Sequence, residues 1–352
     1  MNFYVGGRLQ TSSSPSRVKD DPNTIDRRTL ELFQNTVNGQ KSVFKALTVL
    51  ERERAKPYMP SDDIVRNRQE TFYDDLLPII ESNSGSPAEM YDGLHELLSS
   101  QLAIAGRFPE SMRELESVVR LNRTNESVVT LENSTQYARS RAHLYTTVDL
   151  QPNRMLRCPY TETIMAPEQI MLKDLIVQLG HKDLLPSRFS GGDKYLNCEH
   201  IVPKSWFKEE HPKGISDMHH LIAADGGANQ FRSNCAFRDL NGGGVEGPDE
   251  RPEFINAAGR KLNSNKTFEP TSGKPVAARA TLYFLLCYQG GIPSSKYDVD
   301  ATETLKSWAK LEPPSLYERH RNEAIFEVQK NRNPLIDFAE LVDRIDFSKG
   351  LG

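Results

Sequence analysis

The chain has 352 residues, of which 37% are hydrophobic and 26% are charged, as in an ordinary globular protein. It is long enough for two domains or one decorated domain, and no run approaches the roughly 18 apolar residues that a membrane helix needs. A formal net charge of −4 argues against a general nucleic-acid coat protein, because such proteins carry basic surfaces. It does not exclude an enzyme that acts on nucleic acid through a few phosphate contacts and a metal.

Residues 1–24 are polar and rich in serine, and this composition predicts a disordered leader. They lack the basic region and the apolar core of about 7–15 residues that define a Sec signal peptide. We therefore expect a protein that stays in the cytoplasm of the producing cell or leaves it by a route other than Sec.

Residues 25–150 are predicted to be mainly helical, because apolar residues recur there at helical spacing. Ser86 and Glu89, with Pro87 between them, form a capping box that predicts the start of one helix. The apolar face expected for that helix consists of Met90, Leu94, Leu97, Leu98 and Leu102. No catalytic motif appears in this region, so we expect a helical scaffold or a module that binds a protein partner.

Beyond residue 150 the pattern changes to a mixture of short strands, loops and helices. The expected segments are a strand and turn at 157–161, a helix at 167–175, a loop at 186–193, a strand at 197–202 and an exposed loop at 241–253. The apolar run 281–288 predicts a core helix that starts at Lys274. Asn333 and Pro334 are expected to cap a last helix with one apolar face, formed by Leu335, Phe338, Leu341 and Val342.

The cysteines do not predict a structural zinc site, because the four of them include no C-x-x-C pair. One disulfide between Cys198 and Cys235 is one interpretation. The other is that Cys158, Cys198, Cys235 and Cys287 are all small buried hydrophobic residues.

Glu199 and His200 form the first half of a candidate catalytic site, on a predicted strand that Pro203 ends. The Glu199 carboxylate is a hard oxygen ligand suited to Mg²⁺. His200, with an ordinary pKa of about 6.5, can be neutral at pH 7 and take a proton from water. For the pair alone, a histidine with a purely structural role is the alternative.

The second half follows a second predicted strand at 217–221. Gly226-Gly227 permits a sharp turn into a short helix, and Asn229 is then expected on the first helical turn, facing the metal. Two alternatives stay open, namely Asn229 as a plain helix cap and Asn234 as the competing ligand.

Three arginines are candidates for holding a phosphate group. For Arg279 and Arg321 the sequence does not favour phosphate contact over a structural ion pair. Phosphate contact is favoured only for Arg232, which lies three residues after Asn229.

Together these segments closely resemble the endonuclease I family of ββα-metal nucleases, which are relatives of the HNH fold. The family's Glu-His-x-x-Pro-x-Ser-Trp/Phe segment is present at 199–206, and its Asp-Leu-His-Asn-Leu segment matches 217–221. The further matches are Asn229, 232–234, 268–270, 278–283, Glu318-Arg319, Arg321-Asn322, Gln329 and the C-terminal signature at 331–337. The resemblance spans about 193 to 345.

The chain departs from the family pattern at three places. His220 stands where the family has an asparagine that orients the base, and Phe338 replaces the final histidine of the signature. Residues 1–150 are unlike the short leader that is typical of the family.

The resemblance implies that His200 is the general base and that Glu199 and Asn229 hold one Mg²⁺, or Mn²⁺ or Ca²⁺ in its place. Arg232 is the predicted phosphate contact. The candidate supporting residues of the site are His219, His220 and Asn234. The family also implies cleavage of DNA, and often of RNA, with little sequence preference and with 5′-phosphate ends.

The resulting prediction is an α+β fold with a ββα-metal nuclease core in residues 151–352, embedded in helices and preceded by the helical region 25–150. The predicted function is a metal-dependent endonuclease, used as a toxin or secreted effector, whose partner is nucleic acid and not a membrane. Two alternatives stay open: a nuclease fold that binds nucleic acid without cutting it, and a sequence-specific HNH endonuclease.

Overall fold

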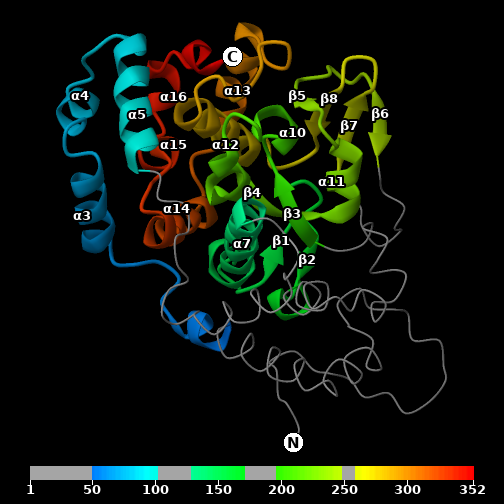
Figure 1. Cartoon of the computed structure of the whole chain (residues 1–352), viewed down its shortest axis with the longest axis horizontal. Helices are drawn as coiled ribbons and strands as arrows, with labels where there is room; N and C mark the ends of the chain where they lie inside the picture. The colour runs from blue at the N-terminus through cyan, green and yellow to red at the C-terminus, as the bar shows by residue number, and fades with distance from the viewer. Residues whose placement is uncertain (1–49, 102–127, 171–195, 248–257) are drawn as a thin grey trace, which may run out of the picture.

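The computed structural model describes residues 50–101, 128–170, 196–247 and 258–352 (Figure 1). The predicted leader and the loop expected at 186–193 lie outside the described residues, as does Leu102. The helix expected from Pro167 does begin there, and its continuation past residue 170 also lies outside them.

The fold is α+β, as predicted, with a majority of helices and, in the described ranges, small two-stranded and four-stranded sheets. The helices are α3 (Asp62–Phe72), α4 (Leu77–Glu81), α5 (Pro87–Gln101), α7 (Val128–His143), α10 (Lys204–Phe207), α11 (Gly226–Arg232), α12 (Lys274–Cys287), α13 (Val299–Ala309), α14 (Leu316–Gln329), α15 (Pro334–Asp337) and α16 (Leu341–Arg344). The strands are β1 (Leu156–Arg157), β2 (Ile164–Met165), β3 (Leu196–His200), β4 (Leu221–Asp225), β5 (Ala236–Phe237), β6 (Val245–Gly247), β7 (Gly259–Leu262) and β8 (Thr267–Pro270).

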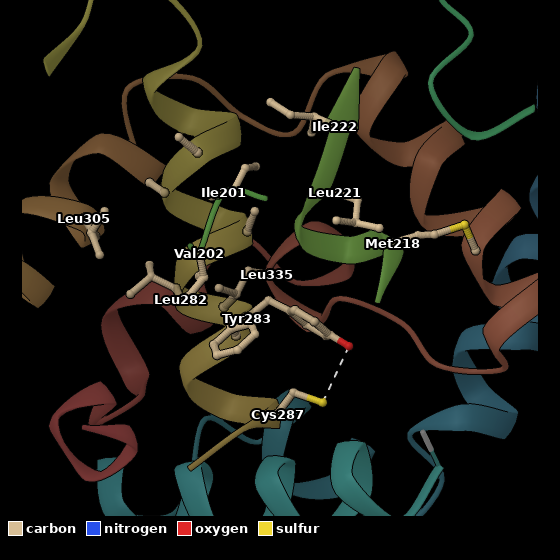
Figure 2. Packing of buried hydrophobic residues seen from close by; sticks show 14 of the residues in the cluster. Ile201, Val202, Met218, Leu221, Ile222, Leu282, Tyr283, Cys287, Leu305 and Leu335 are labelled. Carbon is tan, nitrogen blue, oxygen red and sulfur yellow. Dashed lines mark hydrogen bonds between the residues drawn. The ribbon is translucent and has the colours of Figure 1, made fainter. Parts of the chain in front are cut away.

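Helix α12 lies at the centre of the core, as its apolar sequence predicts. Every residue from Ala277 to Cys287 is buried, and α12 contacts α5, α13 and α15. Figure 2 shows Leu282 and Tyr283 of α12 beside Leu335 and beside Val202, which follows β3. A helix that is buried on all sides carries little amphipathic pattern, which explains why a continuous apolar run identified it.

Helices α3, α4 and α5 pack on this core. The predicted capping box is present, since Ser86 N donates to Glu89 Oε2 at 2.8 Å and Glu89 N to Ser86 Oγ at 3.3 Å. The hydroxyl of Tyr91 on α5 donates to Leu285 O of α12 at 2.9 Å, and one buried apolar cluster includes both Leu94 and Leu282. Residue 150 therefore does not coincide with a break in the core.

Strands β3 and β4 form an antiparallel pair, and α11 follows directly and packs against both (Figure 1). The register places Glu199 opposite Ile222 and His200 opposite Leu221. Asp225 caps α11, because its carboxylate accepts from Gly227 N at 2.9 Å and from Ala228 N at 3.2 Å. The alternative of Asn229 as the helix cap is therefore wrong.

The second strand begins later than predicted, at Leu221 instead of Asp217. Residues 218–220 form a 3-10 turn (η5, Met218–His220), and the Asp217 side chain accepts from His219 N at 3.0 Å. The other carboxylate oxygen of Asp217 accepts from the hydroxyls of Tyr283 and Tyr288, both at 2.9 Å. These buried bonds hold the segment in a turn, which alternation of residue types cannot show.

The last predicted helix is divided into α15 and α16. Asn333 caps α15 as predicted, by accepting from Leu335 N at 3.0 Å. Phe338 leaves the helical conformation, with φ −134° and ψ 82°, because Arg332 holds Asp337 at the end of α15 through two bonds of 2.8 Å.

Two other predictions are corrected. Residues 245–247 of the loop expected at 241–253 form strand β6, which pairs with β7. Of the two interpretations of the cysteines, the Cys198–Cys235 disulfide is wrong, because all four cysteines are free thiols.

Candidate active site on the β3–β4–α11 unit

The Glu199 side chain points toward α11, where it meets Arg232. Glu199 is 3% exposed, and its Oε1 accepts from Arg232 Nη1 at 2.8 Å. Burial raises the pKa of the Glu199 carboxyl to about 7, although the Arg232 charge acts in the opposite direction. A buried carboxylate with one partner charge is stabilised by a further cation.

Arg232 is a buried clamp for the end of β3. Besides Glu199, its guanidinium donates to His200 O at 2.9 Å, to Ile201 O at 2.5 Å and to Cys235 O at 3.1 Å. Arg232 is 1% exposed, and four of its five N–H donors are directed at protein acceptors. The structure therefore shows a structural ion pair and a backbone clamp where phosphate contact was predicted.

His200 is half-buried at the end of β3, on the other side of the strand from Arg232. Its Nε2 lies 3.0 Å from Ile215 O, and because a carbonyl only accepts, Nε2 carries the proton and Nδ1 is the basic nitrogen. Burial, with a smaller contribution from the neighbouring His220, lowers the pKa of His200 to about 3. His200 is therefore neutral at pH 7.

His220, which replaces the expected asparagine, supports the same loop as His200. Its Nε2 donates to Gly214 O at 2.6 Å, and its ring lies 5.7 Å from the His200 ring. Gly214 and Ile215 belong to the 3-10 turn η4 (Pro212–Ser216), so the two histidines hold successive carbonyl groups of one turn. The substitution keeps a hydrogen-bond donor in this buried position.

Asn229 of α11 lies against β3, whereas Asn234 does not. Asn229 Nδ2 donates to Asn197 Oδ1 at 2.9 Å, and Asn197 is two residues before Glu199 on the same strand. Residues i and i+2 of a strand share one face, so Asn229 and Glu199 lie on the same face of β3. Asn234 is exposed in the turn after α11.

His219 lies away from His200, in a second polar cluster. Its ring packs 4.5 Å from Tyr283, and its Nε2 lies 3.4 Å from Asn331 O. Gln329 extends the cluster by accepting from Met218 N at 2.7 Å and donating to Asp217 Oδ1 at 2.9 Å. This C-terminal cluster (Asp217, His219, Tyr283, Gln329 and Asn331) holds the segment between strands β3 and β4.

Arg279 and Arg321 are structural. Arg279 forms two bonds of 2.8 Å with Glu318, and Arg321 pairs with Asp149 and donates to the carbonyls of Met218 and Leu221 at 2.8 Å each. Both guanidinium groups are buried. The ion-pair alternative therefore describes them.

Two residues near His200 were not predicted as part of the site. The Tyr137 ring of α7 stacks on the His200 ring at 5.2 Å between centroids and 27° between planes. Lys204, four residues after His200, is exposed, and its ammonium group has no ion pair or hydrogen bond within the described ranges. Lys204 lies inside the motif at 199–206, so its place in the sequence could have indicated that it is near His200. Nothing in the sequence links Tyr137 to His200.

Among the described residues, no cluster of three or more His, Cys, Asp or Glu side chains suits a metal ion. None of the helices in the described ranges is long and apolar enough to span a bilayer.

Comparisons with known proteins find related nucleases. The chain is 33% identical over 165 residues to the "Extracellular ribonuclease" of Bacillus subtilis (strain 168), and 31% identical over 163 residues to that of Bacillus amyloliquefaciens. Each alignment covers 42% of this chain and 53% of the relative, so the chain spans about half the length of either protein. The family model described as Endonuclease I matches residues 119–340, which is more than half of the chain and begins upstream of the boundary predicted at residue 151. This match includes β3, β4, α11 and the C-terminal cluster, and the chain belongs to the Endonuclease I family.

Proposed function

We propose that the protein is a divalent-metal-dependent endonuclease that hydrolyses phosphodiester bonds of DNA and RNA with little sequence preference. The observation that carries this proposal is the end of β3, where a buried carboxylate and a neutral histidine are adjacent and an amide from α11 shares the carboxylate's face. An acid ligand, a base and a second oxygen ligand are the parts that one-metal phosphodiester hydrolysis requires.

His200 is the proposed general base. Its Nε2–H is held by Ile215 O, so Nδ1 is oriented to take a proton from a water molecule. The water oxygen bonds to phosphorus as that proton leaves, and the bond from phosphorus to the 3′ oxygen breaks. The leaving 3′ oxygen takes a proton from solvent, and the products are a 5′-phosphate and a 3′-hydroxyl end.

Glu199 and Asn229 are the proposed protein ligands of one Mg²⁺, with Mn²⁺ or Ca²⁺ as substitutes. Their oxygens are the hard donors that these ions prefer, and Mg²⁺ is usually held by one or two such residues together with waters and substrate phosphate. When bound, such an ion polarises the phosphoryl group and stabilises the leaving oxygen.

Arg232 is proposed to position Glu199 and the end of β3, and not to bind phosphate. Its guanidinium fixes one carboxylate oxygen of Glu199 and the carbonyls of the next two residues. This leaves the other carboxylate oxygen as the metal ligand. Substrate phosphates then need cations at the surface, and Lys204 is the candidate closest to His200 in sequence.

The substrate class is supported by the relatives and by the site. Both Bacillus relatives are named ribonucleases, and the family match supports a nuclease. Contacts directed at phosphate and sugar carry no sequence information, which favours cleavage with little sequence preference.

The proposal is tested by digesting supercoiled plasmid and total RNA with the full chain, with Mg²⁺ and with excess chelator. We expect a smear of fragments that the chelator abolishes. His200→Ala should lower kcat by about 10²–10⁴-fold, the usual contribution of a general base, with nucleic-acid binding retained. Binding without cleavage in Mg²⁺, Mn²⁺ and Ca²⁺ supports the inactive nuclease fold instead, and discrete bands support a sequence-specific enzyme.

His95→Ala is the matched control. His95 is half-buried like His200, its Nδ1 lies 2.7 Å from Leu286 O, and its ring stacks on Tyr91 at 5.9 Å. It lies on α5, outside the β3–β4–α11 unit. Equal loss of activity in both variants contradicts the assignment of His200 as the base.

A further inference from the structure

Helix α7 is bonded both to the proposed base and to the turn that orients it. Tyr137 stacks on His200, and one helical turn later Ser140 Oγ donates to Ser216 O at 2.6 Å. Residues i and i+3 lie on one face of a helix, so a single face of α7 makes both contacts. This helix lies before residue 150, in the region where the sequence shows no catalytic motif.

The turn η4 is held at three successive carbonyl groups. Gly214 O accepts from His220, Ile215 O is bonded to His200, and Ser216 O accepts from Ser140 of α7. The base, the residue that replaces the family asparagine and α7 are therefore joined through one short segment.

One hydrogen bond does not fix the orientation of an imidazole ring, because the ring can still rotate about the line from Nε2 to the acceptor. A stacked aromatic ring removes that rotation, and aromatic pairs prefer defined offset arrangements. The interplanar angle of 27° between Tyr137 and His200 is such an arrangement. The other neighbouring ring, His220, is tilted by 56° and does not define the plane in this way.

We propose that Tyr137 is a positioning residue of the active site, whose ring fixes the plane of His200 so that Nδ1 faces the attacking water. Arg141 of the same helix packs on the Tyr137 ring, with its guanidinium carbon 5.3 Å from the ring centre. The inference rests on the proposed role of His200 as the base. It assigns part of the site to a helix that precedes the segment carrying the motifs.

The test compares Tyr137→Ala and Tyr137→Phe in the full chain, with kcat and KM measured on a defined oligonucleotide in Mg²⁺. Misplacing a catalytic group by about 1 Å can cost about 100-fold in rate, so we expect Tyr137→Ala to lower kcat by roughly 10–100-fold with little change in KM. Tyr137→Phe keeps the ring and should retain most of the activity. If the wild type is active and Tyr137→Ala has the same kcat, the inference is wrong. It is also wrong if Tyr137→Phe loses as much kcat as Tyr137→Ala.

Phe338→Ala is the control for general loss of packing. Phe338 is also a half-buried ring in an aromatic pair, 5.1 Å from Tyr73, and it belongs to the segment between α15 and α16. If both alanine variants lose stability equally and only Tyr137→Ala loses kcat, the effect is specific to the site. Equal loss of kcat in both variants assigns Tyr137 to packing alone and overturns the inference.

A spectroscopic measurement separates this inference from the proposed function. The His200 ring protons are identified in the NMR spectrum as those missing from His200→Ala. We expect them to shift in Tyr137→Ala, through loss of the aromatic ring current, and to stay near their original position in Tyr137→Phe. Unchanged His200 signals in Tyr137→Ala contradict the stack, whether or not the protein cuts nucleic acid. A wild type that is inactive with every divalent ion contradicts the proposed function instead.

Discussion

At the scale of single residues, Arg232 shows how one residue type serves two different roles in the same sequence context. An arginine near a metal site binds phosphate when its fork faces solvent, and it positions protein groups when it is buried. Here the guanidinium also lies 4.7 Å from the centre of the Phe237 ring, so its face is covered as well as its edge. Burial favours the positioning role over phosphate binding, because a side chain with 1% exposure cannot reach a substrate.

Removing Arg232 should destabilise the protein strongly. Arg232→Ala leaves Glu199 as a buried charge without its partner, and loss of one member of a buried pair costs about 3–5 kcal/mol. Arg232→Lys should not restore stability, because an ammonium group lacks the planar fork that reaches Glu199 and two carbonyls at once. Urea unfolding measures both effects.

The control for Arg232 is Arg238→Ala. Arg238 pairs with Asp298 at 3.0 Å, and the carboxylate partner of that pair is 62% exposed. Exposed pairs of this kind contribute about 0–1 kcal/mol, so the variant should unfold close to wild type. A similar small loss in Arg232→Ala would contradict the clamp.

Lys204 is expected to bind substrate phosphate. Lys204→Ala should raise KM several-fold with kcat nearly unchanged. In a plot of log binding affinity against log salt concentration, the slope should become shallower by about 1, which corresponds to the loss of one phosphate contact. Lys208 is the control, since it is the C-cap residue of α10, one turn after Lys204, and is paired with Glu209 at 3.3 Å. An unchanged salt slope in Lys204→Ala would remove it from the substrate-binding surface.

At the scale of elements, the site depends on how a turn and a helix are joined. Side chains from β3, η5 and α7 bond to three successive carbonyl groups of the turn η4. Gly214 O also accepts from Asp217 N at 3.2 Å, whereas loss of the Ser140 bond leaves the buried Ser216 carbonyl without a side-chain donor. An unsatisfied buried carbonyl costs more than the net contribution of an ordinary hydrogen bond.

Ser140→Ala should therefore cost about 1–3 kcal/mol of stability and also lower kcat. The serine is fully buried, and no other described side chain bonds to Ser216 O. Ser100→Ala on the exposed face of α5 is the control, because its hydroxyl bonds only to Leu97 O at 2.9 Å in a solvent-exposed position. Thermal unfolding and a cleavage assay on both variants check the prediction, and full activity in Ser140→Ala would separate the turn from catalysis.

At the scale of the whole molecule, the described helices of the N-terminal region are part of the nuclease core. Arg68 of α3 pairs with Glu323 of α14 at 2.9 Å, and Gln69 donates to Asp337 at 2.8 Å. The hydroxyl of Tyr73 also donates to Asp337, at 2.8 Å. Residues of the C-terminal signature thus contact both the segment between β3 and β4 and the N-terminal helices.

One cooperative unfolding transition is expected from this shared core. Leu94→Ala should lower the free energy of unfolding by about 2–5 kcal/mol, because Leu94 is 0% exposed beside α12. The unfolding transitions followed by nuclease activity and by near-ultraviolet circular dichroism should move together. Leu311→Ala, at a residue that is 61% exposed, should change stability by less than about 0.5 kcal/mol. Two separate transitions would instead indicate that the N-terminal helices fold as an independent unit.

The sequence by itself determined the elements whose signals are local. The capping box at Ser86, the buried helix α12 and the cap at Asn333 follow from neighbouring residues, and the structure confirms them. The motifs around Glu199 and at 331–337 were enough to identify the family. Each of these depends on residue types within a few positions of one another.

Only the tertiary structure decided what the polar residues of those motifs contact. Arg232 lies inside the hairpin, the C-terminal signature clamps the segment around Asp217, and Tyr137 reaches His200 from more than 60 residues upstream. The physical reason is that a buried ion pair, a hydrogen bond to a distant carbonyl and a ring stack leave no periodic pattern in the chain. They depend on which surfaces meet when the helices close around α12.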